Sequence, residues 1–565
     1  MRFFILTLLV HINSIFAQQP SLLFAKGFGG NALDNGHSVA VDLNNNIFVA
    51  GEFNNTVDFD PNSGVVNISS VGTMTDLFFA KYDASGNYLW AKSVGSTGRE
   101  TVNSIGLDKF GNCYITGYFE GIADFDPGPG TATLSPVAGA RDFYFAKYDA
   151  SGNYLWAKNL NGGNTDIGNA LTIDSVGNIY ITGYFSQTLD FDPGPGTATL
   201  TGNSQAIFFA KYDSLGNYKW AHSLQSIGFN QGNSITLDHS GNLLITGFFS
   251  STIDFDFGPG TASLNGGSRS IYFAKYDNSG NYVWANQIGV SSNTNSYDIA
   301  VDKADNVLIT GVFTGTKDFD AGVGTATLTS NGFGDVFLAK YDQNGNYIWA
   351  KGIGGSNWEE SYTIITDNDN NIYISGYYSS DTDFDPGTGV ATLTTTGAPQ
   401  IFLAKYDFNG DYMWAFDIGS TNNDQGIDIE LDSNGNVFLT GFFSETVDFD
   451  PSSGVSNLTS VSMSPDVFFA KYSSTTVIGL EEINANVDLI KYYPNPCSSK
   501  FNININKEIR NGELIITDVL GQDILHQKVE SGINEISTYN YMHGMYFFAI
   551  TENGSQMICG KFMVE

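Results

Sequence analysis

The sequence predicts an all-β fold, namely a seven-bladed β-propeller with four-stranded blades followed by a small β-sandwich domain. Three series of residues recur in register and predict the propeller: an Asp-Phe-Asp motif, a Trp, and an Asp that closes a short apolar run. The Asp-Phe-Asp motif recurs seven times, 64 to 66 residues apart. It begins at Asp58, Asp124, Asp190, Asp254, Asp318, Asp383 and Asp448.

Composition excludes two classes of protein. The chain has 565 residues, with 59 acidic against 25 basic residues, and a formal net charge of −34. Aromatic residues make up 14% of it, which a disordered acidic tail would lack. A nucleic-acid partner is not expected, because binding phosphates requires a basic surface.

Residues 1 to 17 have the pattern of a secretory signal peptide. Arg2 supplies the positive start, residues 3 to 10 are apolar, and Ala17 is the expected cleavage residue. No later stretch approaches the ~20 apolar residues that cross a bilayer as a helix. We therefore expect an exported protein without a transmembrane segment.

Each repeat has the same internal pattern. In the third repeat, residues 171 to 174, 179 to 185, 207 to 213 and 218 to 221 are apolar or alternating runs that end at Gly/Asn turns. Such runs predict strands and hairpins, with a long loop between the second and third strands. Four strands per repeat suit a propeller blade.

The two ends of the repeat region predict how the ring closes. Residues 23 to 26 match the outer-strand text of a blade but precede the first repeat, whereas the seventh repeat ends near residue 472 without that strand. We expect the N-terminal strand to complete the last blade, which hides the sheet edges of an open array. The predicted propeller spans residues 18 to 475.

The repeat text resembles the SBBP-type β-propeller repeat of secreted bacterial proteins. The shared text is D-x-x-G-N-x-Y-I-T-G followed by F-F-A-K-Y-D-x-x-G-N-Y-x-W-A-K, over about residues 21 to 475. The resemblance implies a propeller, but a fold does not by itself imply a chemistry.

The last segment has a different text, with residues 476 to 490 as the expected linker. It opens with Y-P-N-P at residues 493 to 496 and contains I-T-D-V-L-G-Q at 516 to 522, G-M-Y-F-F at 544 to 548 and G-K-F-M-V at 560 to 564. Through these motifs, residues 491 to 565 resemble the type A C-terminal sorting domain of type IX secretion substrates in Bacteroidota. The resemblance implies an Ig-like β-sandwich, recognition by the type IX machinery, and a secreted or cell-surface location. The residues that carry it include Tyr493, Pro494, Asn495, Pro496, Gly521, Gly544 and Lys561.

Three cysteines are too few for a disulfide framework. Cys113 is expected to be a small buried residue in a strand. Cys497 and Cys559 both lie in the last segment and could pair. The sequence does not decide whether they do.

The Asp-Phe-Asp motifs are the candidate metal sites. In a strand the two carboxylates would share one face, and calcium is the cation that takes several oxygen ligands. The alternative is turn formation, because Asp followed by Pro is common in β-turns. The candidate ligands are Asp58, Asp60, Asp124, Asp126, Asp190, Asp192, Asp254, Asp256, Asp318, Asp320, Asp383, Asp385, Asp448 and Asp450.

The start of each predicted inner strand supplies candidate ligand-binding residues at the ring mouth. They are His37, Asn103, Asn169, Asn233, Tyr297 and Tyr362, with Ile427 in the seventh repeat. Amides and tyrosines around a mouth suit polar ligands such as sugars, and a solvated funnel without a ligand is the alternative. The recurring Trp is expected in the core, and the Lys of the A-K-Y-D text is expected to pair with acids on the surface.

No catalytic constellation is recognisable. The six His follow no common spacing, and no G-x-S-x-G, H-E-x-x-H or P-loop text occurs. Glu359-Glu360 is the one acidic pair that marks a single blade of the repeat, and we interpret it as an exposed loop. The expected function is a non-catalytic binding or structural module, with a glycan or surface protein as partner and calcium as the only candidate cofactor. The alternatives are a carbohydrate-active enzyme with its site at the propeller mouth and a calcium-stabilised surface-layer component.

Overall fold

The computed structural model describes residues 19–474, apart from 138, 161, 290–292 and 396, and residues 490–564, apart from 494–495, 507–508, 510–511, 518–522, 540, 542 and 553–554. The predicted signal peptide and nearly all of the predicted linker lie outside these residues. The chain divides into two compact units, Met1–Thr475 and Thr476–Glu565.

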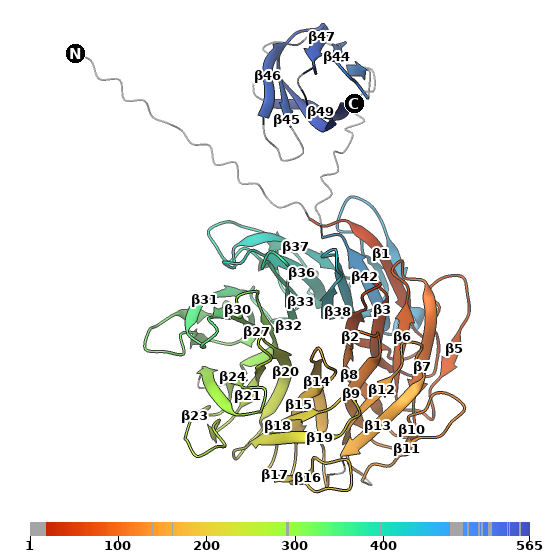
Figure 1. Cartoon of the computed structure of the whole chain (residues 1–565), viewed down its shortest axis with the longest axis vertical. Coiled ribbons are helices and arrows are strands. Elements are labelled where there is room, and N and C mark those ends of the chain that lie inside the picture. The colour runs from red at the N-terminus through yellow and green to blue at the C-terminus, as the bar shows by residue number, and fades with distance from the viewer. Residues whose placement is uncertain are drawn as a thin grey trace, which may run out of the picture. The chain divides into compact units, whose positions relative to one another are not determined.

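In the first unit, seven four-stranded antiparallel sheets stand around a central axis (Figure 1). We number these blades 1 to 7 along the chain. The inner strands are β2 (Asn35–Val41), β8 (Glu100–Leu107), β14 (Ile167–Ile173), β20 (Gln231–Leu237), β26 (Asn295–Val301), β32 (Glu359–Thr366) and β38 (Gln425–Leu431). The second strands are β3 (Ile47–Phe53), β9 (Cys113–Phe119), β15 (Ile179–Phe185), β21 (Leu243–Phe249), β27 (Val307–Phe313), β33 (Ile372–Tyr378) and β39 (Val437–Phe443).

The third strands carry the A-K-Y text, and the outer strands carry the Trp in blades 1 to 6. The third strands are β6 (Asp76–Tyr82), β12 (Asp142–Tyr148), β18 (Ala206–Tyr212), β24 (Ser270–Tyr276), β30 (Asp335–Tyr341), β36 (Gln400–Tyr406) and β42 (Asp466–Tyr472). The outer strands are β7 (Tyr88–Val94), β13 (Tyr154–Leu160), β19 (Tyr218–Leu224), β25 (Tyr282–Ile288), β31 (Tyr347–Ile353), β37 (Tyr412–Ile418) and, in blade 7, β1 (Leu22–Phe28).

The N-terminal strand closes the ring. β1 pairs antiparallel with β42, with Ala25 opposite Ala470, so the first strand of the chain is the outer strand of the last blade. Figure 1 shows the red β1 beside the blue β42. The predicted seven-bladed ring with an N-terminal clasp is confirmed.

A small hairpin fills the long loop of each blade, between the second and third strands. The hairpins are β4 (Thr56–Asp58) with β5 (Asn67–Ser69), β10 (Ala123–Asp124) with β11 (Thr133–Leu134), β16 (Thr188–Asp190) with β17 (Thr199–Thr201), β22 (Thr252–Asp254) with β23 (Ser263–Asn265), β28 (Thr316–Asp318) with β29 (Thr327–Thr329), β34 (Thr382–Asp383) with β35 (Thr392–Leu393), and β40 (Thr446–Asp448) with β41 (Asn457–Thr459). One 3₁₀ turn, η1 (Val461–Met463), follows the last of them.

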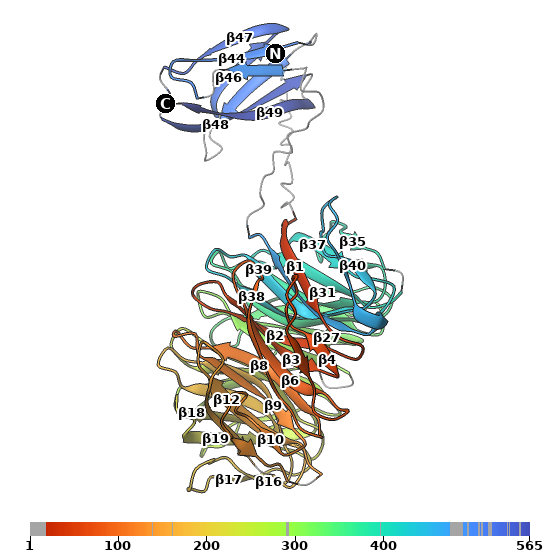
Figure 2. The same ribbon diagram turned by 90° about the vertical axis from the view of Figure 1, so that its right-hand side faces the viewer.

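The hydrophobic core lies between neighbouring blades. Second and third strands such as β3 and β6 are buried along their whole length, because blades cover both of their faces. An aromatic residue of one third strand packs on the tyrosine of the next blade, as Phe79 does on Tyr148 with ring centroids 4.3 Å apart. Equivalent contacts join Phe145 to Tyr212 at 4.5 Å and Phe273 to Tyr341 at 4.3 Å. Figure 2 shows the blades from the side.

The recurring Trp packs against the core, as expected, and also joins adjacent blades. Trp90 is half-buried, and its Nε1 donates to the carbonyl oxygen of Ala150 in the next blade, 3.3 Å away. A Cβ on Gly152 would lie 3.1 Å from the Trp90 ring, so a glycine turn lets the indole approach. Trp414 in blade 6 is the most buried of the series, at 6% exposed.

Pairs of buried carboxyl groups lie at four blade boundaries in the described part of the ring. One acid precedes or begins an inner strand and the other begins the third strand of the previous blade. The pairs are Asp34 with Asp466, Glu100 with Asp76, Asp166 with Asp142, and Glu359 with Asp335, all at most 2% exposed. The backbone holds the members of a pair together: the Glu100 N–H, for example, donates to Thr75, the neighbour of Asp76.

The second unit contains two antiparallel sheets around one apolar core. β43 (Ile490–Tyr493), β44 (Lys500–Ile505) and β47 (Gly532–Ser537) form one sheet; β46 (Asp523–Val529), β45 (Gly512–Thr517), β48 (Gly544–Glu552) and β49 (Ser555–Val564) form the other. Phe501 stacks on Phe562 across the core at 3.9 Å between ring centroids. Cys497 has a free, buried thiol, and the side chain of Cys559 lies outside the described part of the structure.

Candidate functional site

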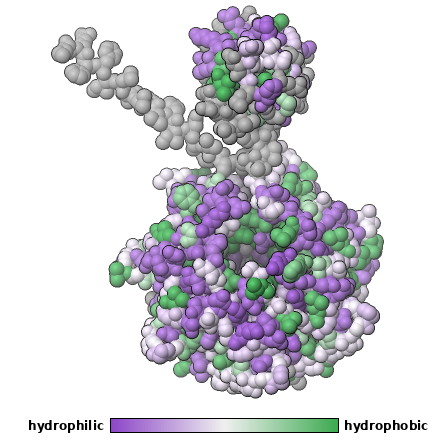
Figure 3. Space-filling model, viewed as in Figure 1, coloured by the Kyte–Doolittle hydropathy of each residue, from purple (hydrophilic) through white to green (hydrophobic). Residues whose placement is uncertain are grey.

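The inner strands surround a central cavity of about 1100 Å³. Figure 3 shows it as a hollow at the centre of one propeller face, with hydrophobic and hydrophilic residues mixed around the rim. All seven predicted mouth residues line the cavity: His37, Asn103, Asn169, Asn233, Tyr297, Tyr362 and Ile427. Each occupies the extra position of a β-bulge in its inner strand, where the register skips one residue. A bulge re-aims a side chain, and here it recurs at the same place in every blade.

In blades 1 to 4 the bulged side chains join one blade to the next. His37 Nδ1 lies 2.8 Å from the Val102 carbonyl oxygen, and Asn103 Nδ2 donates to the Gly168 carbonyl at 3.0 Å. Asn169 and Asn233 repeat the same bond to Gly232 and Ser296, at 2.7 and 2.8 Å. These amides therefore hold the ring together, a use that the sequence analysis did not anticipate.

Blades 5 and 6 depart from this pattern. The Tyr297 hydroxyl donates to Glu360 Oε2 at 2.9 Å, and the hydroxyls of Tyr362 and Tyr377 favour the charged form of this carboxylate. The Tyr297 and Tyr362 rings meet edge to face, with centroids 5.1 Å apart. Burial raises the pKa of Glu360, and the three hydroxyls and nearby Arg269 oppose that shift.

The interpretation of Glu359-Glu360 as an exposed loop is wrong. Both residues begin the inner strand β32, and Glu359 is 0% exposed. Glu359 accepts hydrogen bonds from the Gly355 N–H and the Ser380 hydroxyl, which fixes the loops around it. Glu360 occupies the position that is Asn35, Gln231, Asn295 or Gln425 in other blades, so it is the residue that breaks the repeat.

Blade 4 supplies an arginine and two aromatic rings to the same cavity. The Arg269 guanidinium lies over the Phe248 ring, with Cζ 3.6 Å from the centroid. Its Nε is buried without a hydrogen-bond partner among the described residues. Phe229 lines the cavity as well, and it is 71% exposed. Burial lowers the pKa of Arg269, although a guanidinium stays charged at any physiological pH.

Three further acids line the cavity, in blades 5 and 7. Asp298 accepts from the Ser234 hydroxyl at 2.6 Å and the Ile364 N–H at 2.8 Å, so it bonds to the blades on both sides. Asp428 accepts from the Ser38 hydroxyl at 2.8 Å. Burial raises the pKa of Asp298 to about 6, and those of Asp428 and Glu430 to about 7.

The Asp-Phe-Asp motifs form loops and do not place both carboxylates on one face of a strand. β10 ends at Asp124, whose Oδ1 accepts the Asp126 N–H at 3.1 Å and the Ala132 N–H at 2.7 Å. The Phe125 side chain is 0% exposed and its carbonyl accepts the Tyr148 hydroxyl at 3.0 Å. The expectation that both carboxylates share one face of a strand is therefore wrong, because the second Asp lies beyond the strand end.

The same two bonds recur in every blade. The first Asp of each motif accepts the N–H of the second Asp and the N–H eight residues on, in the loops that begin at Asp58, Asp190, Asp254, Asp318, Asp383 and Asp448. Among the described residues, no group of three or more His, Cys, Asp or Glu side chains is arranged to hold a metal ion. The geometry of these carboxylates supports the turn interpretation.

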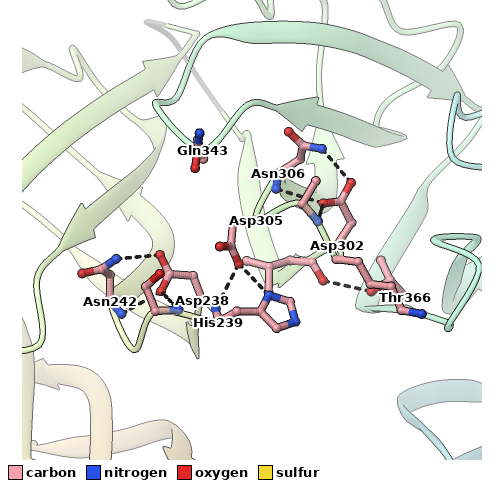
Figure 4. A network of polar contacts seen from close by, with 12 residues as sticks. Asp238, His239, Asn242, Asp302, Asp305, Asn306, Gln343 and Thr366 are labelled. Atoms are coloured by element: carbon pink, nitrogen blue, oxygen red, sulfur yellow. Dashed lines mark hydrogen bonds and ion pairs between the residues drawn. The ribbon is translucent and has the colours of Figure 1, made fainter.

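The Asp that follows each inner strand binds the turn after it and, in all blades but blade 3, pairs with a lysine of the same blade. Asp238 accepts the Asn242 N–H and side-chain amide, both at 2.8 Å, and pairs with Lys275 Nζ at 2.8 Å. Figure 4 shows Asp238 and Asp302 in equivalent turns, with His239 of one blade against Asp305 of the next. The lysine is at most 10% exposed in most of these pairs, for example Lys275 at 9%, so these pairs are buried and the expected surface location is wrong.

Comparison with known families identifies both parts of the chain. The family described as "Beta-propeller repeat" matches residues 22–56, 155–184 and 283–312. The family described as "Secretion system C-terminal sorting domain" matches residues 491–565. This chain carries SBBP propeller repeats and a secretion sorting domain. The sorting domain indicates export, to the cell surface or the medium.

Curated relatives are larger proteins. An uncharacterized WD repeat-containing protein, L264, of Acanthamoeba polyphaga mimivirus is 28% identical over 75% of this chain and 36% of its own length. The regulatory protein FlaEY of Caulobacter vibrioides is 24% identical over 32% of this chain and 19% of its own length. The chain thus spans about a third or less of these relatives. Among solved structures, Sqt1 from Chaetomium thermophilum is 9% identical, with 81% of this chain and 90% of that chain covered and a TM-score of 0.36.

Within the sorting domain the predicted recognition residues are only partly described. Tyr493 ends β43 and is 46% exposed, and Pro496 is exposed. Gly544 begins β48, and Lys561 is an exposed residue of β49. Pro494, Asn495 and Gly521 lie outside the described residues. No helix in the described part of the chain is long and apolar enough to cross a membrane.

Proposed function

We propose that this exported propeller is a non-catalytic binding module that holds a saccharide at the mouth of its central cavity. The observation that carries the proposal is the departure from sevenfold repetition at the mouth. Tyr297 and Tyr362 of blades 5 and 6 stand where blades 1 to 4 have His or Asn, and Phe229 and Arg269 of blade 4 line the same cavity. Glu360, which binds Tyr297, is the one acid at its position among the seven blades. A scaffold that only needed to close a ring would not require these exceptions.

The chemistry of the mouth supports a sugar ligand. Side-chain amides such as Gln231 and Asn295 line the cavity and supply both donors and acceptors for hydroxyl groups. Exposed Phe229 offers a flat apolar face for the C–H face of a sugar ring. The wide opening also leaves room for a chain longer than one residue.

The test is a glycan array probed with the full exported chain and with two matched variants. Phe229 and Phe110 are equally exposed, at 71% and 73%, but Phe110 lies in a hairpin turn and does not line the cavity. We expect Phe229→Ala to weaken saccharide binding at least about tenfold, which corresponds to about 1.4 kcal/mol, and Phe110→Ala to leave it unchanged.

Hydrolysis is measured on the same glycans. Release of new reducing ends by the wild-type chain would show an enzyme and overturn the non-catalytic part of the proposal. Equal weakening by both variants, with thermal unfolding unchanged, would place binding elsewhere on the molecule. Absence of binding to any saccharide on the array would overturn the proposed function.

A further inference from the structure

The structure contains two equivalent arginines that differ in their partners. Arg141 in blade 2 and Arg269 in blade 4 each directly precede a third strand, and each lies over an aromatic ring of the second strand. Arg141 is neutralised: its Nε donates to Glu120 Oε1 at 2.8 Å. Arg269 has no acid within ion-pair distance and no hydrogen bond among the described residues.

The difference comes from one position in the repeat. Glu120 directly follows β9, and the residue that directly follows β21 in blade 4 is Ser250. Ser250 turns its hydroxyl to the Phe229 carbonyl at 3.0 Å and leaves the arginine alone. The place that the Glu120 carboxylate fills in blade 2 is therefore vacant in blade 4. Glu120 is the exception in the repeat, because Ser186, Ser379 and Ser444 stand at this position in blades 3, 6 and 7.

A second replacement puts an aromatic ring beside the vacated place. In blade 2, Arg99 precedes the inner strand and its backbone carbonyl binds the Glu120 N–H. The equivalent residue in blade 4 is Phe229, which is exposed and lines the cavity. Both charged neighbours of Arg141 are thus exchanged for a hydroxyl and a ring.

We propose that Arg269 binds the carboxylate of an acidic saccharide, in the position that Glu120 takes in blade 2, while Phe229 packs against the sugar ring. This inference rests on the proposed function and specifies its ligand class. A guanidinium pairs with a carboxylate through parallel hydrogen bonds, and its planar fork is already oriented here by stacking on Phe248. A chain with a net charge of −34 repels anions in general, so an unpaired arginine in its cavity marks the place where one is accepted.

Glu360 does not compete for Arg269 as an ion-pair partner. The Tyr297 hydroxyl binds its carboxylate, and no ion pair joins it to Arg269 in the described residues. The two charges lie close enough for each to favour the charged form of the other, but the guanidinium keeps its hydrogen-bond donors free.

The experiment measures the affinity of the full exported chain for tetragalacturonate and for its methyl ester by calorimetry. The two probes share the same sugar chain and differ only in the free carboxylates. We expect the acid to bind at least tenfold more tightly than the ester, with affinity that falls as salt is added. Equal affinity for the two probes would overturn the inference, and if both bind at the mouth the proposed function still stands.

Three variants test whether the carboxylate of the bound saccharide lies at Arg269. Arg269→Gln is expected to remove the preference for the acid, and Ser250→Glu should do the same, because it rebuilds the internal partner that Arg141 has. Arg141→Gln is the matched control and should leave both affinities unchanged. Thermal unfolding of each variant checks that it folds. An Arg141→Gln variant that weakens acid binding as much as Arg269→Gln, or a Ser250→Glu variant with an unchanged preference, would overturn the inference.

Discussion

At the scale of residues, the Asp-Phe-Asp motif contains one residue whose role was predictable from the sequence and two whose role was not. The buried Phe between two polar residues was predictable, because its neighbours recur in every repeat and one residue must face the core. The role of the acids was not, because two carboxylates close in sequence suit both a turn and a cation site. In the structure, Asp124 Oδ1 accepts two backbone N–H groups. The second carboxylate packs directly on a loop glycine, because a Cβ on Gly130 would lie 2.0 Å from Asp126 Oδ2.

Substitutions at Asp124 separate the two roles. Asp124→Ala leaves two N–H groups without their acceptor and should lower the free energy of unfolding by about 1 kcal/mol. Asp124→Asn keeps an acceptor oxygen and should stay close to wild type, although it removes the negative charge that a calcium ion requires. Denaturant titration with excess chelator and with added calcium completes the test. A calcium-dependent midpoint that both variants abolish would establish a metal role for the loop.

At the scale of elements, the strands, the clasp and the ring of mouth positions on the inner strands were predictable, and the roles of the side chains at the mouth were not. Strand boundaries follow from Gly/Asn turns and from apolar runs, which local chemistry controls. The clasp follows from one surplus strand at one end and one missing strand at the other. Arg269 was overlooked, and Glu360 was noticed but misinterpreted as part of an exposed loop, because a repeat pattern indicates what the blades share, whereas a binding site depends on where they differ. Aligning the seven repeats and marking residues found in only one or two blades, such as Arg269 and Glu360, would have identified them as candidates.

Covalent closure of the clasp tests whether the ring opens at β1. Ala25 faces Ala470 across β1 and β42, and Ala80 faces Ala91 across β6 and β7 in the same register of a blade. Ala25→Cys with Ala470→Cys closes a loop that contains nearly the whole ring, whereas Ala80→Cys with Ala91→Cys closes a short hairpin. Restricting the unfolded chain stabilises more for the longer loop, by roughly 3–5 kcal/mol at best.

We expect the oxidised clasp variant to shift the denaturation midpoint clearly more than the hairpin variant, and reduction to remove the gain. Equal shifts for the two disulfides would mean that unfolding does not begin by release of β1. Reduced samples of both variants serve as controls for the substitutions themselves.

At the scale of the whole molecule, the buried carboxyl pairs make ring stability depend on pH. Burial raises the pKa of Asp76 and of Glu100 to about 7. The charge of Glu100 also raises the pKa of Asp76, and the charge of Glu120 raises that of Glu100. Asp34 and Asp466 at the clasped boundary, and Asp166, are likewise raised to about 7, and Asp142 to about 6. Four of these acids keep one oxygen without a hydrogen-bond partner in the structure, namely Asp76, Asp142, Asp166 and Asp466. A proton on one carboxyl of a pair would supply the missing hydrogen bond.

The sign of the effect follows from these directions. Unfolded carboxyl groups lose their protons near pH 4, whereas these native groups keep them to about pH 7, so the native state binds more protons in between. Stability from the pairs is therefore complete below about pH 4 and is lost as pH rises through about 7. The buried Lys–Asp pairs act in the opposite direction, since the pKa of Asp238 is lowered, but that contribution changes only below pH 4.

Between pH 5 and pH 8.5 the melting temperature should consequently fall, by on the order of 5 °C or more. The boundary between blades 6 and 7 suggests the control, because Gln400 stands there in place of the first acid, and the N–H of Asp424, the second acid, donates to Pro399, the neighbour of Gln400. Asp76→Asn, Asp142→Asn and Asp466→Asn combined imitate that boundary at three others and should flatten the profile, raising the melting temperature at pH 8.5. A melting temperature that is constant over this range, or that rises with pH in the wild-type chain, would show that the pairs are not protonated at neutral pH. The ring charge would then have to be balanced by another cation.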